Sequence, residues 1–481
     1  MSILYDERPF HTRVKDVMAN QFKVKAIQKA QDVFYTKRKA LVEQVPEWEE
    51  FRTEAAALRD HTLRNLDYYL NMFAENAEKA GAHVFFANSD KEATDYALEV
   101  LRQKEAKMIV KSKSLLTEEI SLNEELIKAG INVNETDLAE FILQTDDWNP
   151  PSHIVVPALH LERSKIREVF HDKLGYEGTE NPEEMTRFVR KFIRKRFLTA
   201  NVGFTGCNFG VAETGSITIV SNEGNGRMSS SIPRTQIAVM GMERLVPDLA
   251  SLDVMMELLV RSSVGAKISN YFSLITGPAK PGEADGPEDL HIIIVNNGRT
   301  NVLGGEFNSM LRCIHCGACM NICPVYRHIT GHAYGSIYPG PMGAVLTPLL
   351  VGYEKAGALP YASTLCGECW EHCPVKIPIH ELLLKHRENI AEHTNVRPAI
   401  EKPIFKTAAT MFANSFLYDM GTKAAAVGMK AVAKDDAMPE WMKVLPVAGG
   451  WIKSKDMGTM KLHKFRDVYA KYEKNKKKGT F

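Results

Sequence analysis

The sequence of 481 residues lacks the features that mark several special classes of protein. No run approaches the ~20 consecutive apolar residues that a membrane-spanning helix needs. Lys and Arg number 60 and Asp and Glu number 59, so the net charge of +1 gives no indication of nucleic-acid binding. The first residues, MSILYDERPFHTR, contain no basic stretch followed by an apolar one, so we expect no signal peptide.

Cysteine is scarce over most of the chain, and its uneven distribution is the most informative feature of the composition. Seven of the eight cysteines lie between Cys313 and Cys373, and the remaining one is Cys207. The other values are ordinary for a globular protein, with 44% hydrophobic and 25% charged residues. They exclude a disordered, collagen-like or disulfide-scaffold protein, and the length indicates roughly three domains.

The pattern of apolar residues divides the chain into four regions. Residues 1–80 place apolar side chains at three- and four-residue steps, which predicts an N-terminal helical region. Residues 81–303 alternate helical stretches with the runs AHVFFA, KMIVKS, INVNETD and SHIVVPAL, which predicts an α/β domain on a mostly parallel sheet. Residues 304–390 carry the cysteine groups, and residues 391–481 predict amphipathic helices with a basic tail that contains KNKKKG.

The cysteines form two groups with the spacing of iron–sulfur ligands. The first group, CIHCGACMNICP, follows the pattern C-x2-C-x2-C-x3-C-P and contains Cys313, Cys316, Cys319 and Cys323. The second group, CGECWEHCP, matches the last three positions of that pattern with Cys366, Cys369 and Cys373, and Ser363 stands at the first position. Three thiolates at three-residue steps wrap a loop around one face of a [4Fe–4S] cluster, so we predict two clusters.

A crossing rule assigns the ligands, because in two-cluster ferredoxins the fourth cysteine of a group ligates the other cluster. Cluster 1 then takes Cys313, Cys316, Cys319 and Cys373. Cluster 2 takes Cys323, Cys366 and Cys369. One corner of cluster 2 lacks a thiolate, and Ser363, water, a backbone group, a partner's ligand or a missing iron all remain open for it.

Zinc and disulfide bonds are the alternative uses of these cysteines. Two C-x2-C pairs could hold zinc, but Cys313/Cys316 and Cys366/Cys369 are separated by 49 residues, against ~15–20 in the zinc pattern. Zinc would also leave the other cysteines of both groups unused. Disulfides are disfavoured because we expect no secretion signal. Cys207 stands alone in a Gly-rich loop, where a buried inert thiol fits better than a ligand.

The sequence contains no evident motif for an organic redox cofactor. No G-x-G-x-x-G follows a strand, and the closest string, GCNFGVAETG, has the wrong spacing. There is also no Walker-type loop and no C-x-x-C-H for covalent haem. Because an electron carrier needs a donor and an acceptor, these absences favour an electron-carrying subunit over a complete dehydrogenase.

Two segments of the α/β region, rich in Gly and acidic residues, are candidate ligand sites. The segment AETGSITIVSNEGNGR offers Glu213 as a nucleophile or base and Arg227 as an anion clamp. The other segment is GPAKPGEADGPEDLH. Turn capping explains both sets of polar side chains somewhat better than ligand binding, since no partnered base is evident. Packing or capping suits His153 and His160 better than metal ligation.

The C-terminal tail is strongly basic. From Lys453 to Phe481 it has ten Lys or Arg residues against three Asp or Glu. Such a stretch is most often a solvated face or a disordered end, and docking on anionic lipid, as a peripheral membrane contact, or on an acidic partner is the alternative.

In the order of its parts, the whole chain resembles the lactate-utilisation iron–sulfur protein (LutB) family. The matching stretches are AETGSI, GPAKPGEADGPEDLH, CIHCGACMNICPVY, LCGECWEHCPVKI, KSKSLLTEEI, ETDLAEFILQ and PSHIVVPALH. The resemblance implies that the α/β region is a LUD domain, similar in fold to sugar-phosphate isomerases (NagB) and CoA transferases, followed by an α-helical ferredoxin-like double-cluster domain. The family's seven cluster cysteines match those of this chain, so the missing eighth thiolate is expected.

The resemblance also implies a function. The protein that it implies is cytoplasmic and acts with two companion subunits in oxidising L-lactate to pyruvate. Its own role there would be to carry electrons through two [4Fe–4S] clusters. The expected partners are these subunits and redox donor and acceptor proteins, without nucleic acid. Two alternatives stay open: a LUD-domain enzyme that acts on an acyl or sugar-phosphate ligand with accessory clusters, and a redox-sensing scaffold. Fold analogy alone does not establish catalysis.

Overall fold

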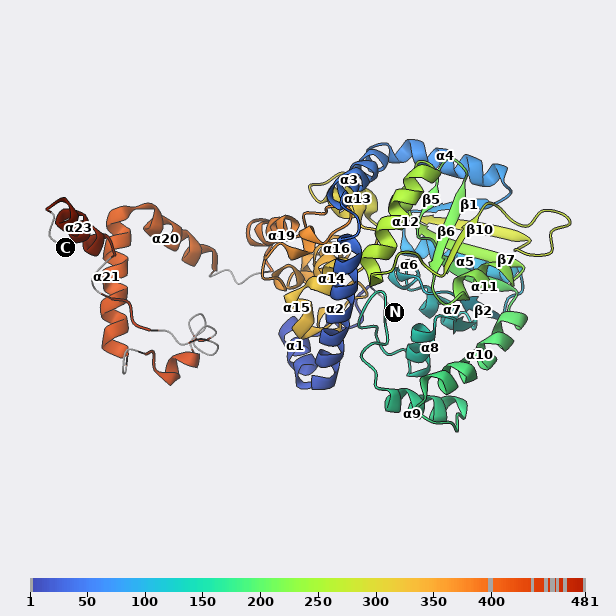
Figure 1. Ribbon diagram of the computed structural model, residues 1–481, viewed down its shortest axis with the longest axis horizontal. Coiled ribbons are helices and arrows are strands. Elements are labelled where there is room, and N and C mark those ends of the chain that lie inside the picture. The colour runs from blue at the N-terminus through green and yellow to red at the C-terminus, as the bar shows by residue number, and fades with distance from the viewer. Residues whose placement is uncertain are drawn as a thin grey trace. The chain divides into compact units, whose positions relative to one another are not determined.

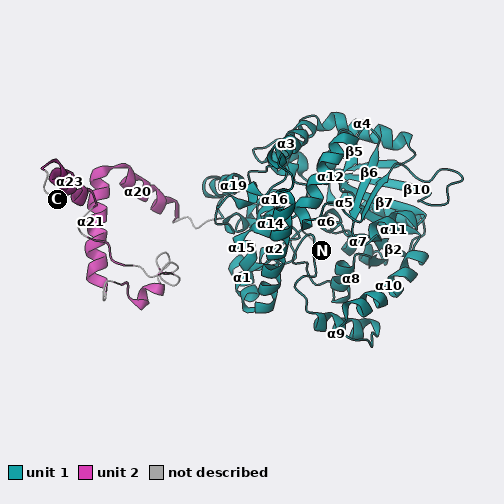
Figure 2. Ribbon diagram, in the orientation of Figure 1, with its two compact units in different colours: residues 1–396 teal, residues 397–481 magenta. Residues whose placement is uncertain are grey.

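The computed structural model describes residues 3–396, 401–433, 437–444, 449, 455, 458–461 and 465–478. The chain forms two compact units, residues 1–396 and residues 397–481 (Figure 2). The four-region division expected from the sequence stays a prediction. None of the described helices is long and apolar enough to cross a membrane.

Four helices begin the first unit: α1 (Phe10–Ala19), α2 (Gln21–Val42), α3 (Trp48–Arg64) and α4 (Leu66–Lys79). Helix α2 begins after Asn20, whose side chain accepts the backbone N–H of Lys23 and so caps the helix. Helices α2 and α3 pack against the cysteine region, and α4 packs against β1 (His83–Ala87). The first three helices therefore support the cysteines, while the fourth supports the sheet.

The α/β part is built on a six-stranded parallel sheet (Figure 1). Its order is β1–β10–β7–β4–β2–β3, and every neighbouring pair is parallel. The further strands are β2 (Met108–Lys111), β3 (Asn132–Glu135), β4 (Val202–Gly206), β7 (Thr235–Gly241) and β10 (Asp289–Val295). The predicted α/β class with a mostly parallel sheet is thus confirmed.

Helices cover both faces of this sheet, as the alternation of its side chains shows. Ile237 and Val239 of β7 pack with helix α5 on one face, whereas Ala238 and Met240 pack with α4 on the other. The helices of this part are α5 (Asp90–Gln103), α6 (Leu115–Glu119), α7 (Leu122–Lys128), α8 (Leu138–Thr145), α9 (Arg163–Leu174), α10 (Pro182–Thr199), α11 (Asn225–Ser231), α12 (Leu249–Val264) and α13 (Arg299–Leu303), with the short η1 (Met242–Arg244).

A second, four-stranded sheet lies in the same unit. Its order is β8–β5–β6–β9, with bounds β5 (Gly210–Val211), β6 (Ser216–Ser221), β8 (Leu245–Val246) and β9 (Tyr271–Ile275). The strand predicted over SHIVVPAL does not form. Instead, the Ser152 N–H donates to the Pro157 carbonyl and the His153 ring accepts the Val155 N–H, so local turns replace ladder hydrogen bonds.

The cysteine region consists of short helices that share a hydrophobic core with α1, α2, α3 and α12. Its elements are η2 (Asn308–Arg312), α14 (Ala318–Ile322), α15 (Pro324–Ile329), η3 (His332–Tyr334), α16 (Gly340–Val351), α17 (Tyr353–Ala356), η4 (Leu359–Tyr361), α18 (Glu368–Glu371) and α19 (Ile379–His393). The cysteine loops are therefore part of the largest core of the unit.

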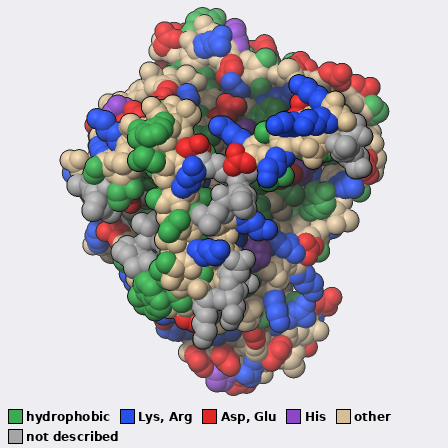
Figure 3. Space-filling view, turned by 90° about the vertical axis from the view of Figure 1, so that its left-hand side faces the viewer, with side chains coloured by type: hydrophobic (Ala, Val, Ile, Leu, Met, Phe, Trp, Pro, Cys, Tyr) green, Lys and Arg blue, Asp and Glu red, His purple; other side chains and the backbone are tan. Residues whose placement is uncertain are grey.

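The second unit contains α20 (Glu401–Ala413), α21 (Ser415–Val432), η5 (Glu440–Val444) and α23 (Phe465–Lys477). Helix α23 has Phe465, Val468, Tyr469 and Tyr472 exposed at helical spacing, with lysines beside them. Figure 3 shows hydrophobic and basic side chains together on the face that it draws. Part of the predicted basic tail, including Gly479 of KNKKKG, lies outside the described residues.

Candidate functional site

The first cysteine loop, residues 313–323, reverses direction around its thiols. His315 and Gly317, on either side of Cys316, have positive φ angles of 55° and 80°. The His315 N–H donates to the Sγ of Cys313 at 3.4 Å. Helix α14 follows Gly317, and Pro324 begins the next helix directly after the last cysteine of the loop, because proline suits the first turn of a helix.

The second cysteine loop, residues 363–373, repeats this geometry. Leu365 and Gly367, on either side of Cys366, have φ angles of 57° and 86°. Helix α18 follows Gly367 as α14 follows its counterpart. The backbone thus adopts the same rare conformation twice, which matches the repeat that the cysteine spacing indicates.

Ser363 occupies the position in the second loop that Cys313 occupies in the first. The Leu365 N–H donates to the Ser363 Oγ at 3.0 Å, just as the His315 N–H donates to the Cys313 Sγ. The hydroxyl oxygen therefore sits where the repeat would place a first thiol. Its ligation of iron stays open.

The pKa values of the thiols show which cysteines lie near one another. Burial raises the pKa of Cys316 to about 12, and the nearby Cys373 and Cys313 raise it further. Burial likewise raises the pKa of Cys369 to about 12, with added effects of Cys323 and Cys366. These effects connect Cys313, Cys316, Cys319 and Cys373 with one another and Cys323, Cys366 and Cys369 with one another, and they also connect Cys369 with Cys319 and Cys373. The division of the cysteines between two clusters stays a prediction.

Buried arginines from the N-terminal helices and the α/β part hold the cysteine loops. Arg52 of α3 donates to the carbonyls of Cys373 at 2.9 Å and Trp370 at 2.7 Å. Arg244 donates to the Cys313 carbonyl at 3.1 Å. These guanidinium groups satisfy loop carbonyls and place positive charge beside the thiols.

The sequence reasoning missed these arginines. Arg52 and Arg59 are separated by seven residues, so both lie on the buried face of α3, among the apolar residues Trp48, Ala55 and Leu63. Arg59 donates to the Leu311 carbonyl at 3.0 Å, immediately before the first loop. The sequence did contain a signal for them: arginine recurs at helical spacing on an otherwise apolar helix face. A charged side chain buried on such a face indicates a buried hydrogen-bond acceptor beside it.

The donor set fits iron–sulfur clusters. All eight cysteines are free, and thiolates are the protein ligands of such clusters. The Sγ atoms of Cys313, Cys323 and Cys373 each accept a backbone N–H at 3.4 Å, the kind of hydrogen bond that tunes cluster potentials. Among the described residues, no three His, Cys, Asp or Glu side chains gather as ligands of one metal ion.

A cavity of about 400 Å³ opens at the carboxyl edge of the parallel sheet, beside the first loop. Residues 112–116 after β2, residues 206–208 at the end of β4 and Gly241 of β7 line it. Ile314 and His315 of the first cysteine loop form part of its wall. The chain leaves β2 toward β3 on one side, while β4 leads to β7 on the other, so this is the switch point where such sheets bind ligands.

The α/β residues singled out from the sequence do not meet in this cavity. Glu213 and Arg227 are both exposed, and β6 lies between them, so the structure does not bring them together. Neither belongs to the lining described above. Cys207 does line the cavity, and burial raises the pKa of its thiol to about 12, which keeps it protonated.

The two predicted packing histidines are buried. The His153 ring hydrogen-bonds to the Asn321 side chain of α14 at 3.0 Å, and burial lowers its pKa to about 4. Burial lowers the pKa of His160 to about 2, and its ring stacks edge-on against His332. Both rings are neutral and connect residues 152–160 to the cysteine region.

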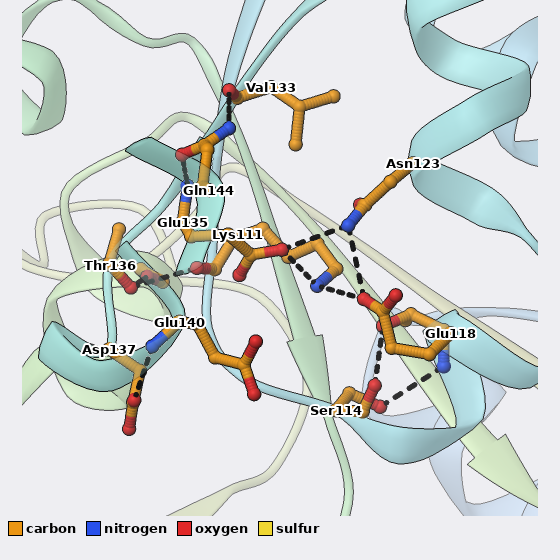
Figure 4. Close-up of polar contacts among 12 residues, drawn as sticks. Lys111, Ser114, Glu118, Asn123, Val133, Glu135, Thr136, Asp137, Glu140 and Gln144 are labelled. Atoms are coloured by element: carbon orange, nitrogen blue, oxygen red, sulfur yellow. Dashed lines mark hydrogen bonds and ion pairs between the residues drawn. The ribbon is translucent and has the colours of Figure 1, made fainter. Parts of the chain in front are cut away.

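A buried charge network follows β2 and β3 (Figure 4). The Lys111 ammonium group contacts Glu135 at 2.6 Å and Glu118 at 3.2 Å, and Asn123 donates to both carboxylates at 3.0 Å. The carboxyl group of Glu140 lies apart from this network in Figure 4. Burial raises the pKa of Glu140 to about 8. The positive charge of Lys113 lowers this pKa, and the negative charges of Glu135 and Glu118 raise it.

Comparisons with known proteins match two families. The LUD domain matches residues 70–295, and the 4Fe-4S dicluster domain matches residues 309–377. The second match indicates iron–sulfur clusters and decides against zinc. A crystal structure of a DUF162 family protein from Deinococcus radiodurans aligns at 14% identity over 48% of this chain and 98% of that chain, with a TM-score of 0.28.

Full-length relatives are similar to the whole chain. Lactate utilization protein B of Geobacillus sp. (strain WCH70) is 49% identical over 99% of this chain and 100% of its own length. The Bacillus subtilis (strain 168) protein of the same name is 49% identical, with 96% of each chain covered. Lactate utilization protein B 1 of Bacillus mycoides (strain KBAB4) is 50% identical over 98% of both chains. The chain belongs to the lactate utilization protein B family.

Proposed function

We propose that this chain is the iron–sulfur electron-transfer subunit of a complex that oxidises L-lactate to pyruvate. The relatives named for lactate utilisation support the pathway, and the cysteine loops support electron transfer. The observation that carries the proposal is the proximity of the two thiol sets. Burial raises the pKa of Cys319, and Cys369 of the other set is near enough to raise it further.

Two [4Fe–4S] clusters held by these thiols would supply one-electron chemistry. We assign Cys313, Cys316, Cys319 and Cys373 to one and Cys323, Cys366 and Cys369 to the other. The chain itself excludes water from most of the thiols, because Cys316, Cys319, Cys323, Cys369 and Cys373 are buried. Cys366 is exposed, so the second loop offers the side from which electrons exchange with another protein.

The buried arginines contribute electrostatically. A cluster with four thiolates carries net negative charge, which increases on reduction. Arg52 and Arg244 place guanidinium groups at the carbonyls of Cys373 and Cys313, so they favour the reduced form. The α/β part contributes Arg244, which connects it to electron transfer even without catalysis of its own.

We further propose that the chain acts in the cytoplasm with two companion subunits, and that the α/β part shares the fold of sugar-phosphate isomerases and CoA transferases. The exposed apolar stripe of α23 supplies a surface for a companion subunit. Anionic lipid is the alternative occupant of this basic helix. Flotation of the full chain with anionic vesicles, compared with co-purification of the companions, distinguishes the two.

Anaerobic reconstitution followed by rapid-mixing reduction tests the function. We expect about eight irons per chain, or about seven if the open corner is empty, and reduction by the lactate-oxidising partner fast enough for turnover. Stoichiometric zinc without broad visible absorption would reject the clusters. Slow or absent reduction would favour a redox-sensing scaffold, and lactate oxidation by the chain alone would replace the carrier function with an enzymatic one.

A further inference from the structure

The cavity beside the first cysteine loop has unused hydrogen-bond donors in its lining. Among the described residues, the Lys113 ammonium group has no hydrogen-bond or ion-pair partner. Asn208 accepts the Val220 N–H through Oδ1 at 2.9 Å, while its Nδ2 donates to no described residue. Both groups therefore face the cavity with donor capacity to spare.

Arg244 adds a third donor and joins the cavity to the cysteines. Its Nη1 donates to the Cys313 carbonyl at 3.1 Å and its Nε lies 3.4 Å from Glu243, while its Nη2 has no partner among the described residues. Its side chain as a whole is only 9% exposed, but Nη2 keeps contact with solvent, since it is not one of the fully buried atoms that lack a partner. An anionic ligand can therefore reach this nitrogen and replace the water there with a charge-assisted hydrogen bond.

Each carboxylate of the same lining accepts at least one hydrogen bond, although Glu223 and Asp137 do so through one oxygen only. Glu243 accepts from Arg299 Nε at 2.7 Å. Glu223 accepts the Leu138 N–H at 2.9 Å, and Asp137 accepts two further N–H groups of the first turn of α8 at 3.1 Å. Burial raises the pKa of the Glu223 carboxyl group, and Lys113 lies close enough to lower this pKa in part, but it forms no ion pair with Glu223. The lining thus offers two cationic donors and one amide donor to the anionic oxygens of a ligand.

We propose that this cavity binds an organic anion, through a carboxylate or phosphate group, directly beside the first cysteine loop. Lys113, Asn208 and Arg244 bind the anionic oxygens, and Ile314 and His315 form the wall nearest the cysteines. A volume of about 400 Å³ lies in the range of sites for small organic molecules. Neither sequence motif nor family description assigns a ligand to this place.

Ligand binding would change the electrostatic potential at the thiols, because Arg244 contacts both the ligand and the Cys313 carbonyl of the first loop. An anion at this distance disfavours the more negative reduced form of a cluster held there, so it lowers the midpoint potential. The second loop does not border this cavity, since its lining includes no residue from 363–373. The effect is therefore specific to the first loop.

The test uses the full chain, reconstituted anaerobically and titrated by calorimetry with pyruvate and with FMN in separate arms. We expect saturable binding of one or both: pyruvate alone identifies a small carboxylate, and FMN alone identifies a phosphate-bearing molecule. Lys113→Met weakens binding about tenfold or more. Asn208→Asp weakens it further, because it keeps the acceptor for the Val220 N–H but replaces the free donor with a negative charge.

Two controls keep the outcome interpretable. Lys165→Met removes an exposed lysine of α9 outside the lining and leaves binding unchanged. Lys113→Arg keeps the charge and retains binding, which separates loss of the cation from misfolding. The second readout is the electron paramagnetic resonance signal and midpoint potential of the reduced protein, which the bound anion shifts in the unaltered chain and in Lys113→Arg but not in Lys113→Met.

Absence of saturable binding by either probe at millimolar concentration would overturn the site. Binding that neither Lys113→Met nor Asn208→Asp weakens would also overturn it. In both cases a protein with normal iron content and partner-driven reduction leaves the electron-carrier function standing. Loss of iron with retained pyruvate or FMN binding would give the opposite result, in which the carrier function fails and the anion site holds.

Discussion

The two cysteine loops have the same backbone but different surroundings. Cys316 of the first loop is buried, and its neighbour His315 lines the cavity at the carboxyl edge of the parallel sheet. Cys366 of the second loop is exposed, and Trp370 behind it is 37% exposed. One repeated ligand pattern therefore lies in two environments: the inner loop adjoins the α/β part, and the outer loop has Cys366 exposed at the surface, where we propose that electrons exchange with another protein.

The largest expected difference between the loops is in single cysteine variants. Cys316→Ala should lose one cluster, about four irons per chain, and abolish lactate-dependent electron flow in the assembled complex. Cys366→Ala should lose the other cluster while the inner one persists. Iron analysis and electron paramagnetic resonance measure both, and full electron flow with Cys316→Ala would contradict the assignment.

The next difference concerns the arginine that supports the outer loop. Arg52→Met removes the buried guanidinium that donates to the carbonyls of Cys373 and Trp370, each of which keeps one backbone N–H donor, so we expect a loss of about 2 kcal/mol in the free energy of unfolding. Arg8→Met is the control, because Arg8 forms only exposed ion pairs, and its loss should lower the free energy of unfolding much less. Equal effects in denaturant titration would refute the supporting role of Arg52.

Making the loops more alike should sharpen the comparison. Ser363→Cys supplies the thiol that the outer loop lacks, at the position where the Leu365 N–H already meets a side-chain acceptor. We expect iron to leave the outer loop several-fold more slowly in air. Thr364→Cys adds a thiol one residue away and should not slow this release. Indistinguishable rates for the two variants would show that residue 363 does not reach the cluster.

The smallest expected effect is a pH dependence near the inner loop. Glu140 lines a small cavity with His153, and its folded pKa of about 8 lies above its ordinary value of 4.5. The folded state then holds a proton that the unfolded state releases, so stability falls as pH rises from about 4.5 to 8. Glu140→Gln should raise stability at pH 8 by about 1–3 kcal/mol and change little at pH 4.

Denaturant titration at both pH values measures this effect. Glu180→Gln is a matched control, because Glu180 is an exposed carboxylate of the same α/β part. If Glu140→Gln and Glu180→Gln change stability in the same way at both pH values, protonation of Glu140 does not contribute to the pH dependence of stability.

Local patterns in the sequence were enough to predict much of this molecule. The runs at β1, β2 and β3 and the cysteine spacing are properties of a few consecutive residues, and they led to the correct parallel sheet and to the iron–sulfur prediction that the family match supports. The run SHIVVPAL misled because its apolar side chains pack against the cysteine region while its backbone forms local turns.

Features that depend on distant residues could not be predicted in the same way. The support of Cys373 by Arg52 spans 321 positions, and no spacing rule links them. The cavity forms from the ends of several strands and one cysteine loop. Lys113 and Asn208 are far apart in the sequence, so their place in one lining could be recognised only from the structure. Glu213 and Arg227 were chosen from one short segment, although β6 holds its two ends apart.

The arginines of α2 and α3 have a consequence for the order of synthesis. Arg38, Arg52 and Arg59 leave the ribosome long before the cysteines whose carbonyls and neighbours they bind. A growing chain thus contains the arginines that hold the cysteine loops before the cysteines themselves have been synthesised. A fragment limited to residues 304–390 has all seven cluster cysteines but lacks these arginines. We therefore expect the excised ferredoxin-like segment to bind iron poorly, although its ligand motif is complete.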